Sequence, residues 1–241
     1  VVAVKRENRA DCLEADSFIS VEDKVIDGRL YWDVPEGEWR IYIIKITGKG
    51  GEPETESYLN PLVPEATDAF ISLIHEEHYR HFGQEFGKTI KGFFTDEPRF
   101  GNAIGYDRVI GKSEMPLPYC DGLIELLSED MGEDYSVYLP CLWHDAGDLS
   151  SDVRYLYMDR VSCMFSENFI GRLGQWCRSH GVKLIGHVVE ENGAHGRLGY
   201  GAGHFYRAVR GMDTSGLDIV NNLLPDQFDG YYHTMFNYYD C

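Results

Sequence analysis

Short apolar runs alternate with amphipathic stretches along the chain, and this alternation predicts an α/β fold. Residues 1–4 and 41–46 are continuous apolar runs of strand length. Residues 64–83 place apolar side chains at helical spacing between Pro64 and Gly83, which predicts a helix. The apolar run 90–95 that follows is typical of a strand buried on both faces.

The second half of the chain continues in the same way. Its pattern predicts helices at 121–132, 152–180 and 203–211, and strands at 137–143, 182–192 and 217–220. Strands that alternate with helices form parallel sheets joined by crossover helices, either as an open sheet or as a barrel. In both arrangements the functional site lies at the carboxyl ends of the strands.

A small β insertion interrupts the first part of this pattern. The stretch "VIDGRLYWDVPEGEW" contains Asp-Gly and Pro-Glu-Gly, which are turn signals between short apolar strands. We therefore expect one catalytic domain over 1–241, with a β-hairpin insertion at about 12–40.

The charge of the chain narrows the partners that it could bind. Its 40 acidic and 22 basic residues give a formal net charge of -18, which argues against nucleic acid and against an anionic membrane. A neutral, hydroxyl-rich ligand or a cation is compatible with this charge. The chain starts without Met, in "VVAV", and ends in "MFNYYDC", so we expect it to be part of a longer polypeptide.

The six cysteines show neither a CxxC pair nor the spacing of metal ligands. We expect them to be reduced and mostly buried thiols. They are Cys12, Cys120, Cys141, Cys163, Cys177 and Cys241.

Two of the predicted buried strands end in paired carboxylates. In "GFFTDEP" the apolar run is followed by Asp96 and Glu97, and in "GHVVEEN" it is followed by Glu190 and Glu191. The polar Thr95 and His187 indicate which face of each strand lines the barrel interior, because polar side chains pack poorly against helices. We expect these faces to carry Phe93, Thr95 and Glu97 on one strand and His187, Val189 and Glu191 on the other.

This facing aims Glu97 and Glu191 at one pocket, with Asp96 and Glu190 pointing outward or supporting it. One carboxyl that donates a proton and another that stays ionised are the pair that glycoside hydrolysis requires. We therefore predict Glu97 and Glu191 as catalytic residues. Carboxylates after a strand also cap helices or bind loop backbone, and that alternative stays open.

Four stretches resemble the catalytic barrel of α-L-rhamnosidase-type glycoside hydrolases, family 106 and its relatives. They are "WDVPEGEWRIYII", "PEATDAFISLIHEEHYRHFGQEFGKTIKGFFTDEPRF", "WCRSHGVKLIGHVVEEN" and "GHFYRAVRGMDTSGLDIV". The resemblance covers about residues 30–225. The blocks around Glu97 and Glu191 are its most specific parts.

The resemblance implies a (β/α)8 TIM-type barrel and inverting hydrolysis of terminal α-L-rhamnosyl or related deoxysugar linkages. It also implies a calcium ion, for which Glu190 is a candidate ligand. By position Glu97 resembles the general acid and Glu191 a second active-site carboxylate. Family members are longer, and five or six candidate strands stand here against eight, so we expect an incomplete barrel that lacks activity when isolated. The alternatives are a retaining β-galactosidase-like barrel hydrolase and a non-catalytic carbohydrate-binding module.

Further polar and aromatic residues near the predicted strand ends are candidates for sugar binding. Trp143 could stack on a pyranose while His144 and Asp145 reach its hydroxyls. The full set that we expect to bind an oligosaccharide or glycoside is Asp96, Trp143, His144, Asp145, His187, Asn192, His195 and His204.

Two motifs that suggest cofactors fail on spacing. "HEEHYRH" differs from the zinc motif His-Glu-x-x-His because Tyr79 stands at the second histidine position, so we expect its three histidines to lie on a solvated helix face. "GRLGYGAGHFYRA" lacks the G-x-G-x-x-G spacing of dinucleotide-binding loops. We therefore expect no nucleotide or organic cofactor.

Overall fold

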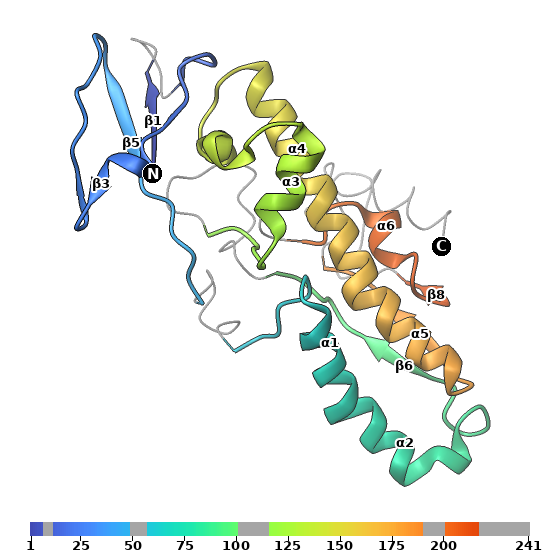
Figure 1. Cartoon of the computed structure of the whole chain (residues 1–241). Coiled ribbons are helices and arrows are strands. Elements are labelled where there is room, and N and C mark those ends of the chain that lie inside the picture. Colours follow the sequence, from blue (N-terminus) through green and yellow to red (C-terminus); the bar gives the residue numbers. More distant parts are fainter. Residues whose placement is uncertain (7–11, 49–56, 101–115, 190–200, 217–241) are drawn as a thin grey trace. The chain divides into compact units, whose positions relative to one another are not determined.

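The computed structural model describes residues 1–6, 12–48, 57–100, 116–189 and 201–216, and Figure 1 shows the elements that they form. The chain divides into two compact units. The first contains 1–48, 109–115 and 121–158, and the second contains 49–108, 116–120 and 159–241. Each unit is described separately below. In the described ranges, no helix combines the length and the apolar character needed to cross a membrane.

The first unit begins with a three-stranded antiparallel sheet. Strand β1 (Val2–Lys5) lies between β2 (Ile19–Ser20) and β5 (Trp39–Tyr42), with Val2 opposite Tyr42 and Lys5 opposite Trp39. The predicted strand at 41–46 thus starts two residues earlier and ends four residues earlier. A 3-10 turn, η1 (Glu22–Lys24), follows β2.

The predicted hairpin lies within this unit. Strands β3 (Val25–Ile26) and β4 (Arg29–Leu30) pair antiparallel around Asp27-Gly28. These two residues have φ of 50° and 72°. Positive φ at both positions is what a two-residue hairpin loop requires, so the Asp-Gly signal predicted this turn correctly.

Helices complete the first unit. Helix α3 (Leu123–Met131) is followed by a 3-10 helix, η5 (Tyr135–Leu142), and by α4 (Asp148–Phe165), whose last residues belong to the second unit. The expected strand at 137–143 was wrong, because these residues form η5. Asp134 caps its first turn by accepting a hydrogen bond from the backbone N–H of Ser136 at 3.0 Å.

The second unit contains the predicted helix at 64–83. It consists of α1 (Pro64–Phe70), a π-helical turn η3 (Ile71–His75), α2 (Glu76–Phe82) and a 3-10 turn η4 (Gly83–Glu85). Its start at Pro64 and its end near Gly83 confirm the prediction. The π-helical turn was not foreseen.

A parallel sheet follows, with strand order β6-β7-β8. Strands β6 (Gly92–Thr95) and β7 (Lys183–Gly186) pair from Gly92 opposite Lys183 to Thr95 opposite Gly186. Strand β8 (Thr214–Ser215) pairs parallel to β7. The parallel arrangement confirms the strand–helix–strand interpretation, while the strand expected at 217–220 lies outside the described residues.

The connections between these strands are helical. Helix α4 continues through a π-helical turn, η6 (Ser166–Gly171), into α5 (Arg172–Ser179), and this confirms the long helix predicted at 152–180. Helix α6 (Phe205–Val209) precedes β8 and matches the helix predicted near 203–211. No sheet of the described residues closes into a barrel, so the (β/α)8 barrel, which we expect to be incomplete in this chain, remains a prediction.

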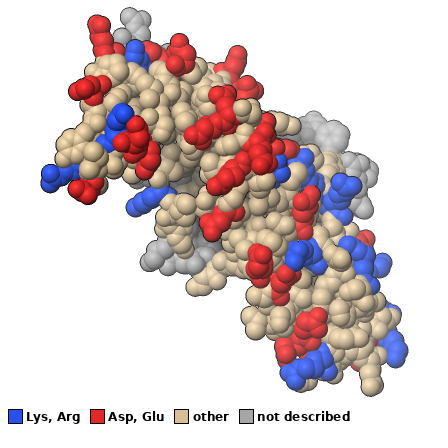
Figure 2. Space-filling view, in the orientation of Figure 1, with Lys and Arg blue, Asp and Glu red and all other residues tan. Residues whose placement is uncertain are grey.

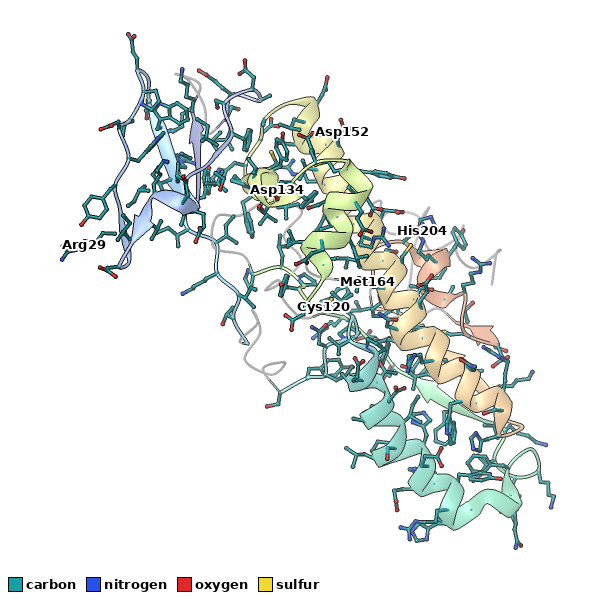
Figure 3. All side chains as sticks on the ribbon, viewed as in Figure 1. Arg29, Cys120, Asp134, Asp152, Met164 and His204 are labelled. Carbon is teal, nitrogen blue, oxygen red and sulfur yellow. The ribbon has the colours of Figure 1, made fainter. Side chains whose placement is uncertain are left out.

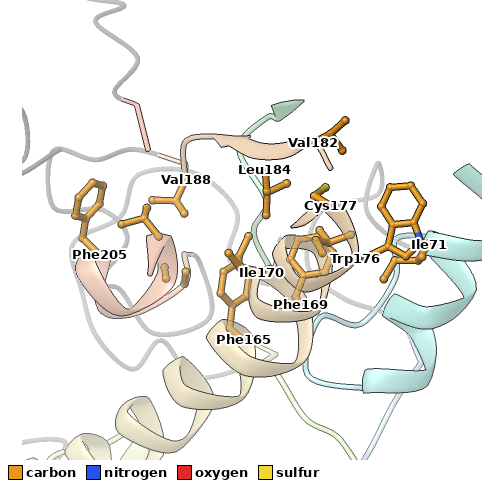
Figure 4. Close-up of a cluster of buried hydrophobic side chains, with 14 residues drawn as sticks. Ile71, Phe165, Phe169, Ile170, Trp176, Cys177, Val182, Leu184, Val188 and Phe205 are labelled. Atoms are coloured by element: carbon orange, nitrogen blue, oxygen red, sulfur yellow. The ribbon is translucent and has the colours of Figure 1, made fainter. Parts of the chain in front are cut away.

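The core of the second unit lies between the sheet and the helices. Phe165, Phe169 and Ile170 from α4 and η6 pack with Leu184 of β7 and Phe205 of α6 (Figure 4). Burying large apolar side chains of this kind contributes about 1.5–3 kcal/mol each. This core covers one face of the sheet. The carboxyl ends of β6 and β7 lie at the edge of the sheet, where α/β folds place their sites.

Acidic side chains are spread over the surface shown in Figure 2, as the net charge of -18 requires. Five of the six cysteines are described, all as thiols, and three of them are buried: Cys120, Cys141 and Cys177. Burial raises the pKa of Cys141 and of Cys177 to about 11, so both are neutral and poor nucleophiles at neutral pH. The expectation of reduced thiols is confirmed for these five, and Cys241 lies outside the described residues.

Candidate functional site

The candidate site is built where β6 and β7 end side by side. The last registered pair of the two strands is Thr95 and Gly186, so the next residues along the chain, Asp96 and His187, lie next to each other. Oδ1 of Asp96 is 2.9 Å from Nε2 of His187. The parallel register therefore joins two predicted site residues that are 91 positions apart in the sequence.

Burial differs sharply between the two partners. The side chain of His187 is 8% exposed, whereas that of Asp96 is 75% exposed. A carboxylate only accepts hydrogen bonds, so Nε2 of His187 carries the hydrogen and donates it to Asp96. A buried donor thus holds a carboxylate that opens to solvent.

The structure corrects the expected facing of β6. Phe93 packs toward the helices, with its ring centroid 4.4 Å from His75 and 5.7 Å from Trp176. Phe94 lies on the other face, where it is 63% exposed and 5.9 Å from the ring of His187. The assignment of Phe93 to the face that would line the barrel interior was therefore wrong, because Phe93 lies on the face covered by helices. Asp96 is the carboxylate that shares the opposite face with Phe94 and His187.

Glu97 occupies a turn directly after β6. It is half-buried and has φ of 44°, in the left-handed region that side chains other than Asn, Asp and Gly rarely adopt. Pro98, which follows it, is buried and cannot continue a strand. The chain therefore ends β6 abruptly and leaves Glu97 at the carboxyl edge of the sheet.

Four of the predicted site residues lie outside the described residues. They are the second catalytic carboxylate Glu191, the metal ligand Glu190, and the substrate-binding candidates Asn192 and His195. The proposed pairing of Glu97 with Glu191, and the calcium ligand Glu190, therefore stay predictions. In the described ranges, no group of three or more His, Cys, Asp or Glu side chains gathers as a metal site would require.

Gly186 is part of the site although sequence reasoning did not select it. It has φ of 153°, and a Cβ added there would lie 2.1 Å from the carbonyl oxygen of Thr95. Only glycine allows the two backbones to approach so closely at the point where His187 begins. The signal in the sequence was a glycine inside the predicted strand 182–192, because glycine within a strand often marks the close approach of another backbone.

His204 has a structural role in the described part of the chain. It is the N-cap residue of α6 (Figure 3). Its Nδ1 accepts a hydrogen bond of 3.3 Å from the backbone N–H of Arg207. This contact orients the ring toward the helix terminus. Sugar binding by His204 stays a prediction.

Trp143, His144 and Asp145 belong to the first unit, and each has a local role there. Trp143 is the C-cap residue of η5, and Nδ1 of His144 lies 3.2 Å from a guanidinium nitrogen of Arg40. Oδ1 of Asp145 accepts from the backbone N–H of Gly147 at 3.0 Å. These contacts hold the turn that follows η5, and sugar binding by the three residues stays a prediction.

The histidine-rich helix differs from expectation at one position. His78 and His81 are exposed, but His75 is 4% exposed and its Nδ1 has no hydrogen-bond partner among the described residues. The expectation of a wholly solvated histidine face was therefore wrong for His75. The cause is its place in the π-helical turn, which directs it against Phe93 and Trp176.

Comparisons of the chain with models of known protein families, with curated proteins and with solved structures found no match. The case for a function consequently rests on the residues and on the geometry described above.

Proposed function

We propose that this chain is part of a glycoside hydrolase of the α-L-rhamnosidase type. Glu97 is the proposed general acid and Glu191 the proposed second carboxylate. The proposal is supported chiefly by one observation: β6 and β7 run parallel in register, so the polar residues that follow them gather at one carboxyl edge. That edge is where α/β folds place their sites.

The chemistry at this edge is suited to a neutral, hydroxyl-rich substrate. A general acid must protonate the glycosidic oxygen as the bond to the sugar breaks, and the second carboxylate must activate water on the opposite face. Glu97 is half-buried next to the buried Pro98, a setting that can hold a carboxyl group at a fixed position. The resemblance in the "FFTDEP" and "GHVVEEN" blocks supports the same two roles.

The test is the Glu97→Gln variant of the longer polypeptide of which this chain is expected to be part, assayed on α-L-rhamnosides, because we expect the isolated chain to lack activity. Turnover of a substrate with a poor leaving group should fall on the order of a hundredfold or more, because the amide cannot donate a proton to the leaving oxygen. A substrate with a 4-nitrophenolate leaving group needs less protonation and should lose much less. Glu129→Gln, at an exposed position of α3, is the matched control and should keep full turnover.

Equal losses on both substrates would contradict the role of Glu97 as an acid. The anomeric configuration of the first product, followed by NMR, separates the inverting mechanism from a retaining one. Inversion requires carboxyl groups about 6.5–9.5 Å apart, and retention about 5 Å. A product with retained configuration would move the proposal to the β-galactosidase-like alternative.

A further inference from the structure

The amino-terminal edge of the parallel sheet is basic, although the whole chain carries a formal net charge of -18. Three segments lead into β6, β7 and β8 at this edge, and they cover residues 83–92, 177–184 and 209–214. Together they contain five basic and two acidic residues. The five basic side chains, which we call the basic edge, are all exposed: Lys88, Lys91, Arg178, Lys183 and Arg210.

Hydrogen bonds hold the three segments of the basic edge side by side. The backbone N–H of Lys183 donates to the carbonyl oxygen of Lys91 at 3.0 Å, which joins the first segment to the second. Nη1 of Arg178 donates to the carbonyl oxygen of Gly211 at 3.0 Å, which joins the second segment to the third. The basic side chains are therefore neighbours in space although they come from distant parts of the sequence.

Most of the positive charge at the basic edge is not neutralised by a carboxylate. Arg178 lies 3.4 Å from Asp213 and belongs to the last turn of α5, where a cation complements the helix dipole. Within the described ranges, no carboxylate forms an ion pair with the other four basic residues. Lys88, Lys91 and Lys183 lie beyond the helix ends, so the helix dipole does not account for them.

A surface of opposite charge lies on the first unit of the same chain. Residues 116–152, which we call the acidic segment, contain nine acidic residues and neither Lys nor Arg. Asp121 and Glu125 are exposed at the start of α3, and no cation pairs with them in the part of the chain that the structure describes. Figure 2 shows acidic side chains gathered over α3, and Lys and Arg side chains near the end of α5.

A second copy of the chain is the partner whose charge fits the basic edge. Two copies repel each other through their net charge, but charges more than about 8 Å apart are largely screened at physiological ionic strength. The groups that face each other therefore decide, and opposite charges fix the orientation of an interface. A nucleic acid would extend past the three segments of the basic edge onto acidic surface, whereas contact with α3 is confined to that edge.

We propose that the basic edge of one copy docks onto the acidic segment of a second copy. Because the two surfaces differ, the contact is heterologous and can repeat from copy to copy. Neither surface contains the carboxyl ends of β6 and β7, so the interaction leaves the candidate site open. The inference goes beyond the proposed function and does not depend on it.

The test is sedimentation velocity of the chain over a series of protein and NaCl concentrations. At low salt the sedimentation coefficient should rise with protein concentration, and added NaCl should return it to the value of a monomer. Lys88→Glu combined with Lys183→Glu should lower the association constant tenfold or more, because like charges then face each other. Asp121→Lys combined with Glu125→Lys should have the same effect from the other surface.

A mixture of the two charge-reversed proteins identifies the surfaces. One protein keeps its acidic segment and the other keeps its basic edge, so an equimolar mixture should form dimers and nothing larger. Lys45→Glu and Glu36→Lys make the same charge changes at exposed positions outside both surfaces and should associate as the unsubstituted chain does. All substituted side chains are exposed, and far-UV circular dichroism checks that each variant is folded.

Two results would overturn the proposal directly. The first is a sedimentation coefficient that does not change with protein concentration at low salt, and the second is association that persists in both charge-reversed proteins. Binding of an oligoglutamate peptide to a chain that itself stays monomeric would also overturn it, because the occupant of the basic edge would then be a different acidic protein.

Discussion

The burial of His75 should make the stability of the second unit depend on pH. Its ring lies 5.4 Å from Phe70, 4.4 Å from Phe93 and 5.1 Å from Trp176. Burial lowers the pKa of His75 from 6.5 to about 4, and repulsion by His78 adds to this. The folded protein therefore keeps the ring neutral over a range in which the unfolded chain takes up a proton.

The sign and the pH range follow from this difference. The full stability is present above pH 6.5, declines as the pH falls from 6.5 toward 4, and declines no further from this group below pH 4. The pKa difference corresponds to at most about 3.4 kcal/mol. Relaxation of the site and entry of water reduce this value, so we expect a loss of about 2 kcal/mol between pH 7 and pH 4.5.

The assay is urea unfolding of the unsubstituted protein and of His75→Phe across this pH range, followed by tryptophan fluorescence. Phenylalanine is larger than histidine, so the absolute stability of the variant can change at every pH. The informative quantity is the change in unfolding free energy with pH, which should be smaller in His75→Phe by about 2 kcal/mol. His81→Phe, at an exposed position of α2, leaves the surroundings of His75 unchanged and should keep the original pH dependence.

The reasoning is refuted if His75→Phe and the unsubstituted protein lose stability in parallel as the pH falls. Titration of the carboxylates affects both proteins equally and cancels in the comparison. A parallel loss would mean that the His75 ring finds a hydrogen-bond partner or water in the folded state.

Three further predictions concern the site itself. Gly186→Ala should destabilise the protein by on the order of 3 kcal/mol, measured by urea unfolding, because its Cβ would lie 2.1 Å from the carbonyl oxygen of Thr95; an unchanged midpoint would contradict the described backbone approach. Glu97→Gly should leave the unfolding free energy equal or raise it by about 1 kcal/mol, because glycine adopts positive φ without strain, while turnover falls as in Glu97→Gln. If calcium binds at Glu190 as proposed, a chelator should lower both the melting temperature and the activity, and a chelator without effect on either would dismiss the ion.

The elements that the sequence predicted well are those with a long or distinctive local signal. The helix from Pro64 to Gly83 repeats its apolar pattern over several turns, and Asp27-Gly28 has few alternatives to a hairpin turn. The run 137–143 was misread as a strand, because a short apolar segment has the same composition in a buried 3-10 helix. Pro140 inside it was the signal against a strand.

The site was predicted in part, and the errors have a physical cause. The alternation of strands and helices predicted that β6 and β7 run parallel. The register that joins Asp96 to His187 was not predicted, because Asp96 was expected to point outward or to support the site while His187 faced the interior with Glu97. The facing of β6 was wrong because Phe93 and Phe94 are both large and apolar. With no difference in polarity between the two, only the packing partners of Phe93, which come from distant helices, decide which ring is buried.

The alternation of side chains between the two faces of β6 ends at the turn that contains Glu97. Side chains alternate between faces only while the backbone stays extended, and the φ of 44° at Glu97 ends the extended conformation. The side chain of Glu97 therefore no longer follows the order set by Phe93 and Thr95. Asp96, the last residue before the turn, still follows the alternation of the strand, and its side chain reaches His187 on the face opposite the helices. Adjacent carboxylates thus obtain different surroundings from one backbone angle: Asp96 is held by His187, while Glu97, the proposed general acid, lies in the turn.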